Sequence, residues 1–166
     1  MRTINELRNG NVKFDVLLPG IKAQTARQAY MSICELAAPL CGVDVAMLYD
    51  RLTLSQVTQN NYIGDGIVVP CLKFSSLDRP YNILATLDRN SQAHMPLAAN
   101  DGEPVDVICL ILSPEAEGTV YLRRLARISR FLRNENLLRC LRSAGNVEGM
   151  TACLIAGDER SDTIAA

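Results

Sequence analysis

The stretch VDVICLILSP, residues 105–114, is apolar almost throughout and constrains the fold more than any other feature of this chain. A strand with one solvated face alternates apolar and polar residues, so this continuous run predicts a central strand buried on both faces. The preceding segment, 100–106, predicts a turn, because its glycine supplies a positive φ and its proline presets φ just before the strand. Such a strand needs covering layers on both sides.

The rest of the chain supplies those layers. Apolar residues recur at helical spacing before and after a strand-rich middle, which predicts an α/β fold, a mixed sheet flanked by helices. Helices are predicted at 23–38, 44–52, 119–134, 134–143 and 147–157, and strands at 67–70, 81–87 and 105–114. The chain shows no internal repeat or Pro/Gly-rich linker, so a single domain over 1–157 is predicted, followed by a disordered tail at 158–166.

The overall composition excludes several classes of protein. With 48% hydrophobic residues, 21% charged residues and a formal net charge of −1, the chain is unlike a disordered or nucleic-acid-binding protein. The first residues, MRTINELRNGNVK, lack an apolar signal region, and no apolar run approaches the length of about 18 residues that a membrane span needs. A cytoplasmic protein without membrane insertion is predicted.

The chain has six cysteines, at wide intervals and without a CxxC or Cys/His ligand spacing. A chain of 166 residues can bury a core without a disulfide or metal, so most of them are predicted to be reduced core residues. They are Cys34, Cys41, Cys71, Cys109, Cys140 and Cys153. His94, the only histidine, lies in a polar segment and is predicted to be solvated. No metal or cofactor is expected.

Two further features each have a functional and a structural interpretation. Gly64, Asp65 and Gly66 precede a predicted strand and favour a turn, although successive backbone N–H groups there could also cradle an anion. Residues 119–143 contain seven arginines against one acid, Glu135. That surface could bind an acidic or phosphate-bearing partner, or it could be a solvated helix face paired with acids elsewhere.

Cys71 follows the proline that ends the predicted strand at 67–70. A catalytic triad is not indicated, because nothing places the only histidine nearby and the G-x-S-x-G motif is absent. Residue patterns alone therefore predict where this thiol lies in the fold but not what it does.

Four motifs in this order are quite specific: ELAA at 35–38, IGDGIVVP at 63–70, DGEPVDVICLILSP at 101–114 and YLRRLARISRFLRN at 121–134. The segment 22–157 that contains them resembles the type-2 enzyme IIA domains of the phosphoenolpyruvate-dependent sugar phosphotransferase system. Within that family it looks most like the nitrogen-regulatory IIA proteins. The resemblance implies a mixed five-stranded sheet flanked by helices and a phosphoryl relay from HPr to a histidine.

The resemblance also implies that polar members of the family site have been exchanged. Cys71 occupies the position of the phosphorylated histidine, and Tyr121 that of a second family histidine. A family arginine falls at Ser55, or at Leu54 if the loop shifts by one residue. In the family a glycine usually follows the histidine, and Leu72 occupies that position here. In the family, the helix that begins near Tyr121 lies beside the active site. This suggests that Arg123 and Arg127 are candidates for partner docking.

Two functions of different classes follow from this resemblance. The first is a regulatory binding module that has lost phosphotransfer and acts on an HPr-like phosphocarrier or on a regulated kinase, transporter or enzyme. The second is a phosphocarrier that uses Cys71 as acceptor. An ordinary thiol is only a few per cent thiolate at neutral pH, so activation would need a nearby cation. Lys73 shares a strand face with Cys71 and could lower its pKa. Redox sensing by Cys71 is a further alternative.

Overall fold

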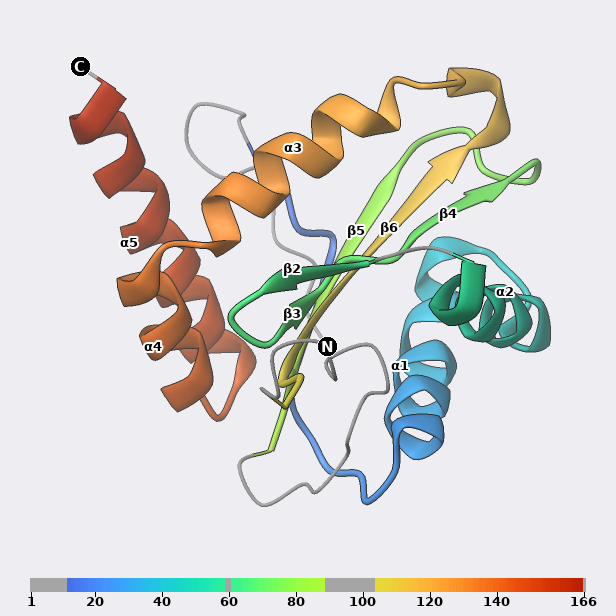
Figure 1. The fold of residues 1–166 in the computed structure, drawn as a ribbon, viewed down its shortest axis with the longest axis horizontal. Coiled ribbons are helices and arrows are strands. Elements are labelled where there is room, and N and C mark those ends of the chain that lie inside the picture. Colours follow the sequence, from blue (N-terminus) through green and yellow to red (C-terminus); the bar gives the residue numbers. More distant parts are fainter. Residues whose placement is uncertain (1–11, 59–60, 89–103, 166) are drawn as a thin grey trace.

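The computed structural model describes residues 12–58, 61–88 and 104–165, and these form three layers (Figure 1). The middle layer is a mixed sheet. On one side of it lie α1 (Ala26–Cys41) and α2 (Val45–Thr58). On the other side lie three helices: α3 (Tyr121–Leu132), α4 (Glu135–Ser143) and α5 (Val147–Ala165). The predicted α/β fold class is confirmed.

The sheet combines parallel and antiparallel pairs. Its strands are β1 (Val16–Ile21), β2 (Tyr62–Gly64), β3 (Ile67–Val68), β4 (Cys71–Phe74), β5 (Tyr81–Leu87) and β6 (Val107–Pro114). Their order is β1-β5-β6-β3-β2, and β4 also pairs with β6. The β5–β6 and β2–β3 pairs are antiparallel, whereas β1 runs parallel to β5, and β3 and β4 run parallel to β6.

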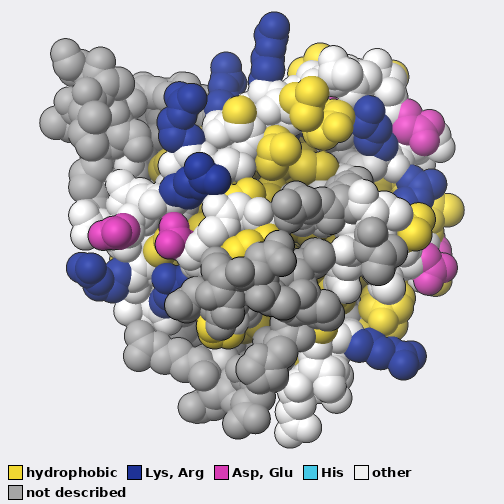
Figure 2. Space-filling model, in the orientation of Figure 1, with side chains coloured by type: hydrophobic (Ala, Val, Ile, Leu, Met, Phe, Trp, Pro, Cys, Tyr) yellow, Lys and Arg dark blue, Asp and Glu magenta, His cyan; other side chains and the backbone are white. Residues whose placement is uncertain are grey.

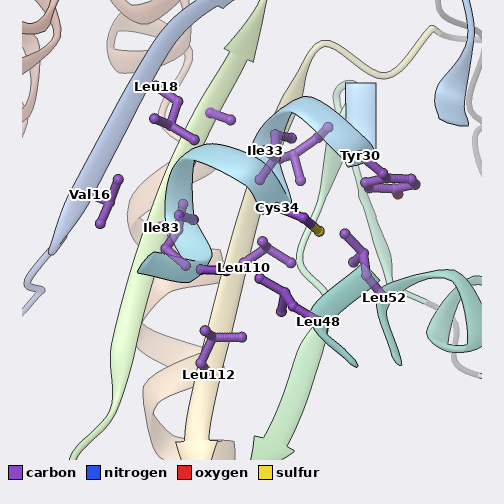
Figure 3. Close-up of a cluster of buried hydrophobic side chains, with 14 of the residues drawn as sticks. Val16, Leu18, Tyr30, Ile33, Cys34, Leu48, Leu52, Ile83, Leu110 and Leu112 are labelled. Carbon is purple, nitrogen blue, oxygen red and sulfur yellow. The ribbon is translucent and has the colours of Figure 1, made fainter. Parts of the chain in front are cut away.

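β6 is the central strand that the sequence predicts, and all eight of its residues are buried. Its side chains alternate between two apolar clusters, because successive residues of a strand point to opposite faces. Leu110 and Leu112 join the cluster under α1 and α2, while Cys109 and Ile111 join the one under the other three helices. Figure 3 shows the first cluster, with these residues labelled: Val16, Leu18, Tyr30, Ile33, Cys34, Leu48, Leu52, Ile83, Leu110 and Leu112.

The structure has six strands where the resemblance implies five, and Pro70 accounts for the difference. β3 and β4 both pair with the same edge of β6, Ile67 opposite Val107 and Cys71 opposite Ile111. Pro70 lies between them and has no N–H to donate, although its carbonyl accepts a hydrogen bond from the Ile111 N–H at 2.9 Å. The two pieces are thus one strand path interrupted at a proline.

Helix boundaries differ from the predicted ones in several places. α1 begins after Thr25, whose side chain caps the Gln28 N–H, rather than at residue 23, and ends where Gly42 adopts a left-handed conformation. α2 continues to Thr58, beyond the predicted end at 52. α5 is helical through Ala165, so a helix occupies the stretch from 158 where a disordered tail is expected. The domain boundary at 157 stays a prediction.

Four of the six cysteines are outside a disulfide, in agreement with the prediction for most of them. Cys140 and Cys153 are the exception: they form a disulfide between α4 and α5, with their Cα atoms 5.7 Å apart. Among the described residues, no helix has the length and apolar character required to cross a membrane.

Candidate functional site

A cavity of about 300 Å³ lies between α2, β4, the end of β6 and the start of α3. The residues that line it are Arg51, Leu54, Ser55, Thr58, Cys71, Leu72, Lys73, Ser113 and Tyr121. The three positions that the resemblance singles out, Ser55, Cys71 and Tyr121, therefore share one cavity although 66 residues separate the first from the last. The carboxyl ends of parallel strands are a common location for binding sites in α/β proteins.

The hairpin before β4 directs the chain into this cavity. Gly64, Asp65 and Gly66 all have positive φ, at 100°, 55° and 78°, and they join the antiparallel strands β2 and β3. The Gly66 N–H donates to the Tyr62 hydroxyl at 3.2 Å, and the Gly66 carbonyl accepts from the Val107 N–H at 3.2 Å. These bonds tie the hairpin to the protein itself, so the predicted turn is confirmed and the Gly66 N–H is already engaged.

Cys71 begins β4 and its side chain is half-buried against the cluster under α3. Its Sγ lies 3.7 Å from the Val69 carbonyl oxygen. Burial raises the pKa of the Cys71 thiol to about 11, because the thiolate loses hydration there, and the positive charge of Arg124 offsets only part of this rise. The thiol is therefore protonated at neutral pH.

Lys73 shares the cavity-facing side of β4 with Cys71, as the strand periodicity predicts. Its ammonium lies 4.8 Å from the centre of the Tyr121 ring, a cation–π contact. The charge of Arg124 lowers the pKa of Cys71, but the net shift is upward, so the thiol is not activated overall. A contribution from Lys73 stays a prediction.

Ser55 is buried, and its hydroxyl is occupied by the protein. The Ser55 Oγ donates to the Leu52 carbonyl at 2.7 Å and accepts from the Asn61 Nδ2 at 3.4 Å. Leu54, the alternative position, is 59% exposed at the rim of the cavity. Neither residue supplies the positive charge that the resemblance assigns to an arginine.

Two arginines that the sequence analysis does not single out bring positive charge to the cavity and its wall. Arg51 lies one helical turn before Ser55, donates to the Lys73 carbonyl and stacks over the Phe74 ring at 4.4 Å. Arg124 donates to the Ser113 Oγ at 3.0 Å and to the Glu117 carboxylate at 2.9 Å. The four-residue spacing from Ser55 could have indicated Arg51, since residues i and i+4 share a helix face.

The sequence of this chain matches the family model of the EIIA 2 component of the phosphoenolpyruvate-dependent sugar phosphotransferase system over residues 13–156. The chain belongs to this EIIA family. The match contains every lining residue of the Cys71 cavity.

Relatives of this EIIA chain include proteins called nitrogen regulatory protein. That of Bradyrhizobium diazoefficiens is 29% identical over 140 residues, covering 84% of this chain and 89% of the relative. That of Escherichia coli (strain K12) is 25% identical over 130 residues, covering 77% of each.

Solved structures show the same EIIA fold. The nitrogen regulatory protein IIA-Ntr from Neisseria meningitidis superposes with a TM-score of 0.70 at 15% identity, covering 83% of this chain and 92% of that one. The mannitol IIA from Escherichia coli gives a TM-score of 0.61 at 14% identity, covering 83% and 94%. At these identities the likeness concerns the fold alone.

The remaining candidate residues of the EIIA chain lie elsewhere. Arg123 and Arg127 are exposed on α3 and line a second cavity instead of the Cys71 cavity. Figure 2 shows Lys and Arg side chains along the edge of the molecule that α3 occupies in Figure 1. His94 lies outside the described residues. Within residues 12–58, 61–88 and 104–165, no three His, Cys, Asp or Glu side chains are grouped to hold a metal ion.

Proposed function

We propose that this EIIA chain is a nitrogen-regulatory-type protein that acts as a regulatory binding module and no longer carries a phosphoryl group. The similarity to nitrogen regulatory proteins along 84% of the chain supports the branch. The replacement of the phosphorylated histidine by Cys71, together with Tyr121 and Ser55 at the other polar positions, supports the loss of transfer.

The burial of Cys71, which raises the pKa of its thiol, is the observation that carries this proposal. The nucleophile of a cysteine phosphocarrier is the thiolate, not the thiol. With a pKa of about 11, the thiolate makes up about one part in ten thousand at pH 7. A histidine in that position would instead offer a neutral nitrogen nucleophile at the same pH.

The neighbours of Cys71 support the same conclusion. A transferred phosphoryl group needs positive charge and hydrogen-bond donors around its oxygens. Here Arg51 donates to a backbone carbonyl, and the charge of Arg124 is balanced by Glu117. The Ser55 hydroxyl donates to its own helix. These groups serve the fold and would have to leave their partners to serve a phosphoryl group.

Phosphoryl uptake tests the proposal. The native protein, Cys71→Ser and Cys71→His are incubated with phosphoenolpyruvate, enzyme I and HPr, and intact masses are recorded. The native protein is expected to gain no phosphoryl group, while a nitrogen regulatory protein with its histidine, used as positive control, gains one. Uptake by the native protein that disappears in Cys71→Ser would contradict the proposal.

Phosphoryl uptake that depends on Cys71 would indicate the alternative function, a phosphocarrier that accepts the phosphoryl group on Cys71. One observation favours it: the charge of Arg124 lowers the pKa of this thiol, which is the kind of activation that a thiolate nucleophile needs. Burial outweighs this effect, so we keep the binding module as the main proposal.

Docking on a protein partner uses Arg123 and Arg127 in this proposal. Both are exposed on one face of α3, and their charge suits an acidic surface on the partner, whether a phosphocarrier or a regulated kinase, transporter or enzyme. Retention of the protein on an immobilised acidic peptide measures this docking. Arg123→Glu with Arg127→Glu is expected to abolish retention and Arg139→Glu, on α4, to reduce it little. Equal loss in both variants would remove α3 as the docking surface.

The proposed site of action is the cytoplasm.

A further inference from the structure

A second cavity, of about 480 Å³, lies between α3 and the segments that lead into β1 and β5. We call it the arginine groove. Its lining comprises Val12, Lys13, Asp15, Arg79, Pro80, Asn82, Val120, Arg123, Arg124, Arg127 and Ile128. Arg124 lines the arginine groove and its charge also acts on Cys71. None of the residues that line the Cys71 cavity lines the groove.

The arginine groove has five cationic side chains and one acidic one. The acid, Asp15, is buried and fully engaged: its Oδ1 accepts from Arg79 at 3.0 Å and its Oδ2 accepts from the Asn82 N–H at 2.8 Å. Arg124 is paired with Glu117. The charges of Arg123 and Arg127 are therefore not balanced by the acid that lines the groove.

Arg123 and Arg127 stand one helical turn apart on α3, where like charges repel. Among residues 12–58, 61–88 and 104–165, neither makes an ion pair or a side-chain hydrogen bond. The first turn of α3 also carries no acid and no side-chain cap at Val120, although its N-terminal end is positive. An anion between the two arginines would relieve the repulsion and stabilise this helix end.

Asn82 adds a second, independent sign of a polar ligand. This side chain is only 6% exposed and lines the arginine groove. Its Nδ2 donates to the Lys13 carbonyl at 2.7 Å, which fixes the orientation of the amide. Its Oδ1 is buried without a hydrogen-bond partner among the described residues. Because a buried acceptor without a partner costs free energy, a hydroxyl or amine of a ligand would be favourable there.

We propose that the arginine groove binds a small phosphate monoester that also carries a hydroxyl group. The phosphate lies between the guanidinium groups of Arg123 and Arg127, whose planar forks match phosphate oxygens. The hydroxyl pairs with the Oδ1 of Asn82, which is out of contact with solvent in this structure and must turn towards the groove to accept the hydrogen bond. This binding is reversible and involves no covalent step, and it does not depend on whether Cys71 accepts a phosphoryl group.

Calorimetric titration of the full chain tests this, with glycerol 3-phosphate, inorganic phosphate and glycerol as probes. Glycerol 3-phosphate is expected to bind more tightly than inorganic phosphate, and glycerol to give no signal. Arg123→Ala and Arg127→Ala should each weaken binding about tenfold or more, as expected for lost hydrogen bonds to a charged group. Arg139→Ala, an exposed arginine on α4 outside the groove, is the matched control and should bind like the native protein.

Asn82→Leu separates the second contact from the first. It keeps the size of the side chain, and its folding is checked by thermal melting. The preference for glycerol 3-phosphate over inorganic phosphate should fall towards one in this variant, while binding of inorganic phosphate persists. An unchanged preference would overturn the assignment of the hydroxyl to Asn82.

Three outcomes overturn the proposal as a whole. One is no heat of binding for either phosphate probe at millimolar concentration. Another is equal weakening in Arg139→Ala, which indicates nonspecific attraction to basic charge. The third is tighter binding to vesicles containing phosphatidic acid than to glycerol 3-phosphate, which assigns the arginines to a lipid surface. Phosphoryl uptake is measured separately, so failure here leaves the proposed function standing.

Discussion

The two cavities near Arg124 differ in how they are built. The Cys71 cavity takes much of its wall from α2 and β4, and its lining cations Arg51 and Lys73 contact the Phe74 and Tyr121 rings. The arginine groove takes most of its charge from one exposed helix face, where Arg123 and Arg127 have no acidic neighbour in the groove beyond the engaged Asp15.

The difference teaches where function can change in this fold. Strands β4 and β6, which belong to the buried sheet, fix part of the shape of the Cys71 cavity. In our proposal this cavity does not transfer a phosphoryl group, because a buried thiol stays protonated. The exposed charges of Arg123 and Arg127 depend little on the core, although the lining residues Val12 and Ile128 belong to it.

Ile111→Ala gives the largest expected effect and tests the dependence of the Cys71 cavity on the core. Ile111 is fully buried and lies opposite Cys71 in the β4–β6 pair. The lost burial and the space left behind should lower the free energy of unfolding by about 3–4 kcal/mol. Arg127→Ala, in the groove, should change it by less than about 0.5 kcal/mol. Urea denaturation measures both, and similar losses would contradict the contrast.

Removal of the disulfide should have a somewhat smaller effect. Cys140 and Cys153 join α4 to α5 across 13 residues of sequence, and a closed loop of this size contributes about 2–3 kcal/mol. The variant Cys140→Ser with Cys153→Ser is therefore expected to unfold at lower urea. Alkylation of Cys71 in the folded protein should remain slow. Rapid alkylation would show that the Cys71 cavity depends on these helices after all.

Arg124→Ala should have a smaller effect on stability than the loss of Ile111 or of the disulfide, and it touches both cavities. The ion pair with Glu117 is partly buried, with side chains 18% and 25% exposed, so its loss should lower the free energy of unfolding by about 1 kcal/mol. Since the charge of Arg124 lowers the pKa of Cys71, the variant should titrate at still higher pH. Arg139→Ala is the control, and a fall in the Cys71 pKa in Arg124→Ala would contradict the electrostatic assignment.

The sequence predicts the fold well where a pattern is local. The buried run of β6 and the helical spacing of α1 and α3 are such patterns. β1 is missed because its sequence, VLLPGI, contains a Pro-Gly pair that is typical of a turn. A proline is tolerated there because β1 lies at the edge of the sheet.

The candidate site is predictable only through the resemblance, which brings Ser55, Cys71 and Tyr121 together. The direction of the Cys71 pKa could not be predicted, because it depends on burial by residues distant in sequence. The arginine groove is missed for the same reason. Its walls come from segments around Asp15, Asn82 and Arg123, and no sequence spacing shows that Asp15 is already paired with Arg79.

The pKa of the Cys71 thiol is the most direct test of the central claim that this position holds a neutral thiol instead of a nucleophile. The thiolate absorbance of the native protein minus that of Cys71→Ser isolates this group, and circular dichroism at each pH confirms that the fold persists. We predict a midpoint near the value of about 11 that burial imposes. A midpoint at or below about pH 8 would mean an activated thiolate, would contradict the account, and would favour the cysteine phosphocarrier.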